Sequence, residues 1–240
     1  MDLTNKRILG LFAHPDDETF ICGGSLAHFA KRGAKVTVVS ATKGEMGRRM
    51  GNPPLISRES MPQVREEELR EACRRLGIEE PVFLGIRDKT VEYEDEASLI
   101  GRLASIVADD QPDVVLTFHP VWGGHPDHCA IGSASEAAVA AAAKAGRANP
   151  ALYYLSFGDP LGGINHGGTL RPHDVVRVDV SDSLREKLLA FRAHRSQTEM
   201  DAWVWQPDRQ ALNRFNKHEF FIAAGAASVH HSAEWFGEKY

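Results

Sequence analysis

Two short clusters of histidine and aspartate could hold a metal ion: AHPDDE at residues 13–18 and HPDH at residues 125–128. Each cluster directly or closely follows an apolar run that is typical of a buried strand. Either one alone is also explained by a helix cap or by exposed histidines around a turn. Their shared position favours one divided site, because ligands bind at the carboxyl ends of parallel strands.

The spacing within the clusters suggests which residues would be the ligands. His14 and Asp17 are three apart at a strand-to-helix junction, so both side chains can turn to one side, and His128 can supply a third ligand. Two imidazoles and one carboxylate leave the fourth position of a tetrahedral Zn²⁺ open, as in catalytic zinc sites. A water bound there would have its pKa lowered to about 7. Fe²⁺ or another divalent ion accepts the same ligands.

The remaining polar residues of the clusters are candidates for proton transfer. Asp16 adjoins the ligands and is the expected general base. His125 is expected at the opposite edge of the site, with Asp127 fixing its tautomer and favouring the imidazolium. Both aspartates have a second interpretation: Asp16 can cap a helix that begins near Phe20, and Asp127 one that begins near Cys129. Capping and catalysis are compatible.

Apolar runs alternate with helical patterns along the chain, which is typical of βαβ units. We therefore expect an α/β, Rossmann-like fold: a mostly parallel sheet with helices on both faces, formed by residues 1–240 as a single domain. Long loops are expected at residues 44–60 and 158–172. The expected strands are residues 7–12, 35–40, 81–84, 113–118, 151–156 and 174–180.

One predicted helix, residues 62–76, carries an arginine on its apolar stripe. Ser60 and Gln63 have the spacing of a capping box at its start, as Ser183 and Glu186 have before a later helix. Arg65 lies four residues before Leu69 on the stripe, so it points into the protein. An inward guanidinium needs a partner, and two remain open: a neighbouring carboxylate or a substrate group.

Composition limits the classes of partner. With 28 Lys and Arg against 33 Asp and Glu, the net charge is −5, so we expect no nucleic-acid partner. No apolar stretch approaches the roughly 18 residues of a membrane span. We expect a cytoplasmic protein with no membrane partner.

The residues together resemble the PIG-L/LmbE-like zinc deacetylases, which hydrolyse the acetamide of N-acetylglucosamine conjugates. The resemblance rests on AHPDDE, GEMG at 44–47, Arg65 with Glu67, HPDH and HRSQ at 194–197. It implies the roles that the family gives to the matching positions: His14, Asp17 and His128 as metal ligands, Asp16 as base, His125 as acid or oxyanion stabiliser with Asp127 behind it, and Arg65 as a sugar contact.

Within the family, the stretches at 44–54 and 84–90 are most similar to the bacillithiol-pathway N-acetylglucosaminyl-malate deacetylases of the second type. This implies a small-molecule substrate, N-acetylglucosaminyl-malate, with Glu45, Arg48, Asn52 and Arg87 as further contacts. Arginines would suit an anionic aglycone, although they can equally be structural. An inositol-linked or chitooligosaccharide-like conjugate is the near alternative.

Two other classes of protein remain open. A sugar-nucleotide transferase could hold a Mg²⁺-diphosphate on Asp16 and Asp17, but it would need neither His14 nor His128. A non-catalytic metal- or sugar-binding module would bind zinc without releasing acetate. The segments 122–124, 158–168 and 201–240 have no assigned role and are candidates for an aglycone pocket or for a homo-oligomer contact.

Overall fold

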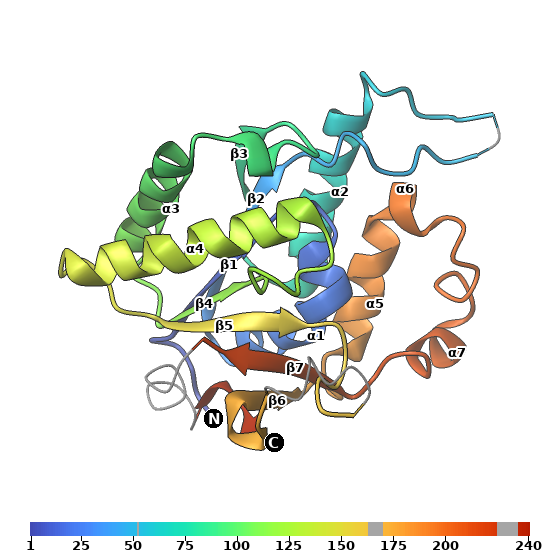
Figure 1. Cartoon of the computed structure of the whole chain (residues 1–240). Coiled ribbons are helices and arrows are strands. Elements are labelled where there is room, and N and C mark those ends of the chain that lie inside the picture. The colour runs from blue at the N-terminus through green and yellow to red at the C-terminus, as the bar shows by residue number, and fades with distance from the viewer. Residues whose placement is uncertain (52, 163–169, 225–234) are drawn as a thin grey trace.

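In the computed structural model, residues 1–51, 53–162, 170–224 and 235–240 are described (Figure 1). Eight strands form one sheet in the order β3-β2-β1-β4-β5-β7-β6-β8. The five strands from β3 to β5 are parallel, and β7 pairs antiparallel with both β5 and β6. The expected mostly parallel α/β sheet is confirmed. The strands are β1 (Arg7–Phe12), β2 (Lys35–Thr42), β3 (Val82–Ile86), β4 (Val114–Thr117), β5 (Ala151–Ser156), β6 (Val175–Asp179), β7 (His218–Ala223) and β8 (Glu238–Lys239).

The helices pack in two groups. The helices α3 and α4 pack against each other, and α4 lies on β1, β4 and β5; α1, α2 and α5 form the second group (Figure 1). Right-handed crossovers that leave the sheet centre in opposite directions place their helices on opposite faces. The bounds are α1 (Asp17–Ala30), α2 (Met61–Leu76), α3 (Glu96–Asp110), α4 (Pro126–Lys144), α5 (Leu184–Ala193), α6 (Arg195–Thr198) and α7 (Asp208–Leu212), with 3₁₀ turns η1 (Val91–Tyr93) and η2 (Pro172–Asp174).

The sheet order creates a crevice between two neighbouring strands. From β1 the chain moves outward through β2 to β3, then returns to place β4 on the other side of β1, where Ile8 pairs with Val36 on one side and with Val114 on the other. The loops that follow β1 and β4 therefore diverge, and ligands bind at such a switch point. These two loops carry the AHPDDE and HPDH clusters.

The two strands that precede these loops, β1 and β4, are apolar and buried. All four residues of β4 are buried, as are five of the six in β1. Strands covered on both faces are expected to be near-continuous apolar runs rather than alternating ones. The site is thus built on the most buried part of the molecule.

Both predictions of a capping box are wrong. Ser60 has helical backbone angles, and the N–H of Met61 already donates to Ser57 O, so Ser60 lacks the extended conformation that capping requires. The hydroxyl of Ser183 donates to Asp182 Oδ1 instead of capping α5.

Two helices also begin earlier than expected. The helix α1 begins at Asp17 rather than near Phe20, and α4 begins at Pro126 rather than near Cys129. Proline is well suited to the first helical position because its fixed φ is already helical and it has no N–H to satisfy. Within the described residues, no helix combines the length and the apolar character that a membrane crossing needs.

Candidate metal centre and active site

The first cluster is held in place by its own backbone. His14 follows β1, and Asp17 begins α1. Asp17 Oδ2 accepts hydrogen bonds from the N–H groups of Ala13 (3.2 Å) and His14 (2.8 Å). The turn between β1 and α1 is thereby closed, and Asp17 Oδ1 is left to face His128 Nε2 at 3.2 Å.

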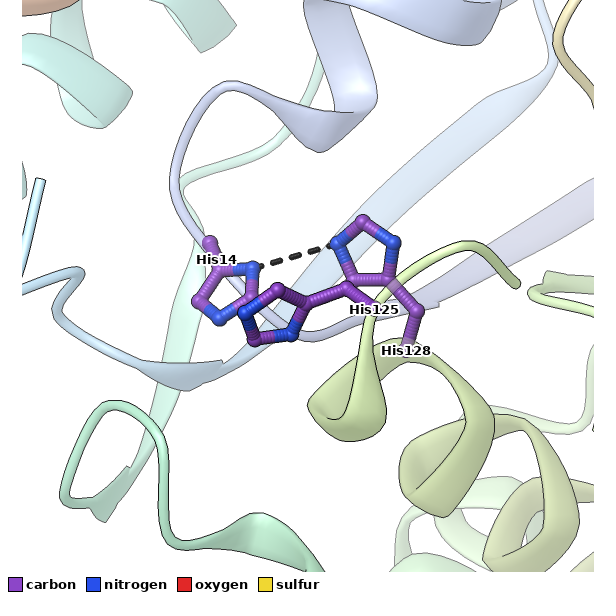
Figure 2. A group of neighbouring side chains, drawn as sticks. All are labelled: His14, His125 and His128. Atoms are coloured by element: carbon purple, nitrogen blue, oxygen red, sulfur yellow. Dashed lines mark hydrogen bonds between the residues drawn. The ribbon is translucent and has the colours of Figure 1, made fainter.

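Two imidazole nitrogens face each other across the crevice. His14 Nδ1 lies 3.2 Å from His128 Nε2, and Figure 2 shows the two rings turned toward each other. The other nitrogen of each ring has an acceptor: His128 Nδ1 lies 2.9 Å from Gly123 O, and His14 Nε2 lies near two carboxylates. Because a ring nitrogen facing an acceptor carries the proton, the two facing nitrogens are lone pairs in the neutral rings.

His14 Nδ1, His128 Nε2 and the two carboxylate oxygens of Asp17 thus lie close together, with Oδ1 facing His128 and Oδ2 facing His14. Asp17 Oδ2 lies 3.7 Å from His14 Nδ1, so all three side chains meet in the crevice. The neighbouring carboxylates raise the pKa of both His14 and His128, so protons lie among these groups when no metal is bound, and a divalent cation would take their place on the neutral rings. The donor set fits a divalent metal that accepts nitrogen and oxygen ligands, as the sequence predicted.

In the described residues, two groups of side chains each bring three possible ligand atoms within 4.8 Å of one another. One group is His14 with His125 and His128, and the other is His14 with Asp88 and Asp127. His14 belongs to both. The three histidines of the first group are partly exposed, while the second group consists of His14 and the two buried carboxylates behind its ring.

Asp127 lies behind His14, which corrects the expectation that it lies behind His125. Its Oδ2 is 3.1 Å from His14 Nε2 and accepts from Lys89 N, and its Oδ1 accepts from Val91 N. The reason is topological: these N–H groups follow β3 and anchor the fully buried carboxylate on the His14 side. A carboxylate behind a ligating histidine fixes its tautomer and strengthens it as a ligand.

Asp88 makes a second contact to the same nitrogen, and sequence reasoning did not assign it. Asp88 Oδ1 lies 3.2 Å from His14 Nε2. Burial lowers the pKa of His14, but the hydrogen bonds to Asp127 and Asp88 outweigh it and raise this pKa to about 10. The signal in the sequence was the position of Asp88 just after the third strand, on the same rim as the other clusters.

His125 lies beside the two facing histidines as a neutral donor. Its ring meets that of His14 edge-on at 5.0 Å (Figure 2). Its Nδ1 accepts from Asp127 N at 3.1 Å. Burial lowers the pKa of His125, and the charges of His14 and His128 lower it further. The expected imidazolium is therefore not favoured; with Nδ1 occupied as an acceptor, Nε2 carries the proton.

Asp16 adopts a strained backbone conformation at the start of α1. Its φ of 102° lies in the left-handed region, which costs on the order of 1–3 kcal/mol for a residue other than glycine and is typical of functional sites. Asp16 is the N-cap residue of α1 by position, but its side chain makes no cap bond. The carboxylate is thus left available for another task.

That carboxylate is paired with Arg65, as the first of the two interpretations of this arginine expects. Its Nη2 donates to Asp16 Oδ2 (2.7 Å) and to Pro15 O, and its Nη1 donates to Gly44 O. Only 3% of Arg65 is exposed. Arg65 therefore makes the internal ion pair that was one of its two interpretations, while its Nε has no hydrogen-bond partner among the described residues. A contact between Arg65 and the sugar stays a prediction.

The surroundings of Asp16 adjust its proton affinity. Burial raises the pKa of Asp16 to about 6, while the charge of Arg65 acts in the opposite direction. A carboxylate with a pKa near neutrality is mostly ionised at pH 7 and can still be protonated during a reaction. Asp16 has the proton affinity of a general base.

The other expected substrate contacts lie in the loops that follow β2 and β3. Glu45 Oε2 accepts from Asp88 N, so it supports the carboxylate behind His14. Arg48 donates to Gln197 O and pairs with Asp201 at 3.3 Å. Arg87 is exposed next to Asp88. Substrate contacts by Glu45, Arg48 and Arg87 stay predictions, and Asn52 lies outside the described residues.

Comparison with known proteins matches the chain to deacetylases. A family model described as PIG-L, GlcNAc-PI de-N-acetylase, matches residues 9–139. A probable N-acetyl-alpha-D-glucosaminyl L-malate deacetylase 2 from Bacillus cereus is 37% identical over 81% of this chain and 84% of its own length. A 1D-myo-inositol 2-acetamido-2-deoxy-alpha-D-glucopyranoside deacetylase from a Mycobacterium species (strain KMS) is 32% identical, over 82% of this chain and 75% of its own.

The fold is also found in solved structures. An N,N'-diacetylchitobiose deacetylase from Pyrococcus horikoshii superposes with a TM-score of 0.68, covering 98% of this chain and 91% of that one at 22% identity. This likeness concerns the fold. The two curated relatives carry the evidence for the chemistry, since they match over most of their own lengths.

Proposed function

The chain belongs to the PIG-L family of de-N-acetylases, and we propose that it uses Zn²⁺ to remove the acetyl group from N-acetylglucosaminyl-malate. Hydrolysis of an acetamide is the reaction that the curated relatives share in their names. The metal, the aglycone and the role of each residue are the parts that we propose.

The observation that carries the proposal is the proximity of His14 Nδ1, His128 Nε2 and the carboxylate of Asp17. Two imidazoles and one carboxylate form a common ligand set of catalytic zinc. A bound Zn²⁺ would polarise the acetyl carbonyl and lower the pKa of water in the site. Asp88 and Asp127 would keep the His14 proton on Nε2, so that Nδ1 stays a ligand.

Asp16 would accept the proton of the attacking water. Its pKa near 6 keeps most of the carboxylate ionised at pH 7, and Arg65 holds the carboxylate at 2.7 Å from its guanidinium. The proton that Asp16 takes up can then be passed to the nitrogen of the amide, so that the sugar leaves as a free amine with acetate as the second product.

His125 would donate a hydrogen bond to the oxygen of the acetyl group. Its proton lies on Nε2 because Nδ1 accepts from Asp127 N. A neutral N–H donor stabilises the negative charge that develops on a carbonyl oxygen during hydrolysis. The resemblance to deacetylases gives His125 this role or that of an acid, and its lowered pKa favours hydrogen-bond donation over proton transfer.

The malate aglycone is supported by the relatives with the higher identity and by Arg87, which is exposed beside Asp88. An exposed guanidinium on the loop that carries Asp88 suits a dicarboxylate. The second candidate, an inositol-linked N-acetylglucosamine, is supported by the mycobacterial relative. An uncharged inositol would gain nothing from Arg87.

The test is to incubate the chain with both conjugates and to measure the free amine, with and without a chelator. We expect a higher kcat/KM for the malate conjugate, loss of activity with chelator, and recovery on addition of Zn²⁺. Asp16→Asn is the matched control, expected to bind metal without releasing amine. A preference for the inositol conjugate would refute the malate assignment, and no amine from either would refute the proposed activity.

A further inference from the structure

Asp16 depends on a neighbour for its strained backbone. The N–H of Asp16 donates to Glu18 Oε2 at 3.0 Å. This hydrogen bond is made while Asp16 has a φ of 102°, and it ties the side chain of Glu18 to the residue that must present its carboxylate to the site. Glu18 itself is completely buried, so it needs partners of its own.

His194 is the principal partner of Glu18. Its Nε2 lies 2.7 Å from Glu18 Oε1, and both side chains have no exposed area. The same oxygen also accepts from Thr19 Oγ1. Among the described residues, His194 Nδ1 has no hydrogen-bond partner, so the position of this ring is set by its bond to Glu18 and by packing, including the ring of Phe20 edge-on at 6.0 Å.

The segment that carries His194 is anchored on two other elements of the site. His194 lies between α5 and α6. Two residues on, Ser196 donates from its N–H and its hydroxyl to Glu68 of α2, both at 2.6 Å. Gln197 Oε1 accepts from Arg48 N, and its Nε2 donates to Arg48 O. The HRSQ motif thus contacts α1 through Glu18, α2 through Glu68, and the loop after β2 through Arg48.

We propose that His194, acting through Glu18, is a positioning residue for Asp16. This inference rests on the proposed role of Asp16 as the base. When His194 donates to one oxygen of Glu18, the other oxygen is directed at the N–H of Asp16 and holds its left-handed turn. Arg65 fixes the carboxylate of Asp16, while the pair of Glu18 and His194 fixes its backbone.

The test replaces the donor while keeping the ring. His194→Phe should lower kcat by about 10- to 100-fold, the range expected from a small misplacement of a catalytic group, with KM and metal content unchanged. His194→Gln keeps a donor at the position of Nε2 and should recover most of kcat. Ser196→Ala is the matched control, because it loses the hydroxyl contact to Glu68 in the same segment, keeps the N–H contact, and should keep the parental kcat.

A second readout does not depend on activity. Hydrogen exchange of the Asp16 amide in the metal-free protein should be faster in His194→Phe than in the parent and close to parental in His194→Gln. In the double variant His194→Phe with Glu18→Gln, kcat should be no lower than in the less active of the two single variants, because the losses from residues that act in series do not add.

The outcomes separate this inference from the proposed function. A parent chain that releases no amine would refute the function. An active parent together with parental kcat and parental amide exchange in His194→Phe would overturn the role of His194. Equal losses in His194→Phe and His194→Gln, or additive losses in the double variant, would overturn it as well. A His194→Phe variant that does not fold leaves the comparison of His194→Gln with Ser196→Ala, in which a large loss of kcat in the first alone contradicts the inference.

Discussion

Removing the charge of Arg65 should move the pH profile of the enzyme. Two unit charges about 4 Å apart attract by about 4 kcal/mol at an effective dielectric constant of about 20, and one pKa unit corresponds to about 1.4 kcal/mol. Arg65→Met should therefore raise the pKa of Asp16 by about 3 units, from about 6 to about 9. The sign follows because a buried carboxylate without its cation favours the protonated form.

At pH 7 most of Asp16 would then be protonated and could not accept a proton. With a pKa near 6, about nine-tenths of Asp16 is ionised, and with a pKa near 9 about one-hundredth is. The rate at pH 7 should fall by about 100-fold and recover as the pH is raised toward 9. The assay is kcat against pH, with metal content measured in parallel and expected to stay at the parental level.

The control variant keeps a positive charge at position 65. Arg65→Lys keeps the charge but cannot reach Gly44 O, Pro15 O and Asp16 together as the guanidinium does, so its acidic limb should move less. An acidic limb that stays near pH 6 in Arg65→Met would refute the ion-pair argument. A rise in KM with an unchanged pH profile of kcat would instead support a contact between Arg65 and the sugar.

Three further predictions concern the ligand set, the carboxylate behind His14 and a buried ion pair between Lys187 of α5 and Glu219 of β7. His14→Ala should lose bound metal, whereas Asp16→Ala should retain it and lose hydrolysis; equal metal content in both would contradict the ligand assignment. Asp127→Asn should weaken metal binding by about 10- to 100-fold, measured by competition with a chelator, and unchanged affinity would contradict its place behind His14. Lys187→Met leaves Glu219 without the ammonium that pairs with it at 2.5 Å in the interior; the variant should lose about 3–5 kcal/mol of unfolding free energy in denaturant titration, and a stability equal to the parent would refute this.

The parallel half of the sheet was predictable from sequence, because strands buried on both faces are continuous apolar runs. The bounds of β1 and β5 were predicted without error, and β4 within one residue at each end. The strand β7 was missed, although HEFFIA is apolar enough. Its position depends on antiparallel pairing between β5 and β6, and no local pattern encodes which distant strand pairs with which.

The residues that meet in the crevice were predictable, while their supporting contacts were not; their role as metal ligands stays a prediction. His14, Asp17 and His128 were expected together because spacing and strand ends are local signals. That Asp127 lies behind His14 depends on N–H groups of Lys89 and Val91, which only the packing of α4 against η1 brings near. Such contacts between distant segments leave no periodic trace in the chain.

The strain at Asp16 explains how two adjacent aspartates take different tasks. Asp17 turns its carboxylate back to the N–H groups of Ala13 and His14 and forward to His128. An ordinary helix start would direct consecutive side chains about 100° apart on one spiral. The left-handed turn at Asp16 breaks that spiral, so that its carboxylate reaches Arg65 of α2 instead. A helical φ at Asp16 would remove this separation of the two carboxylates, so the proposed role of Asp16 as base depends on Glu18 and Arg65, which hold its backbone and its carboxylate.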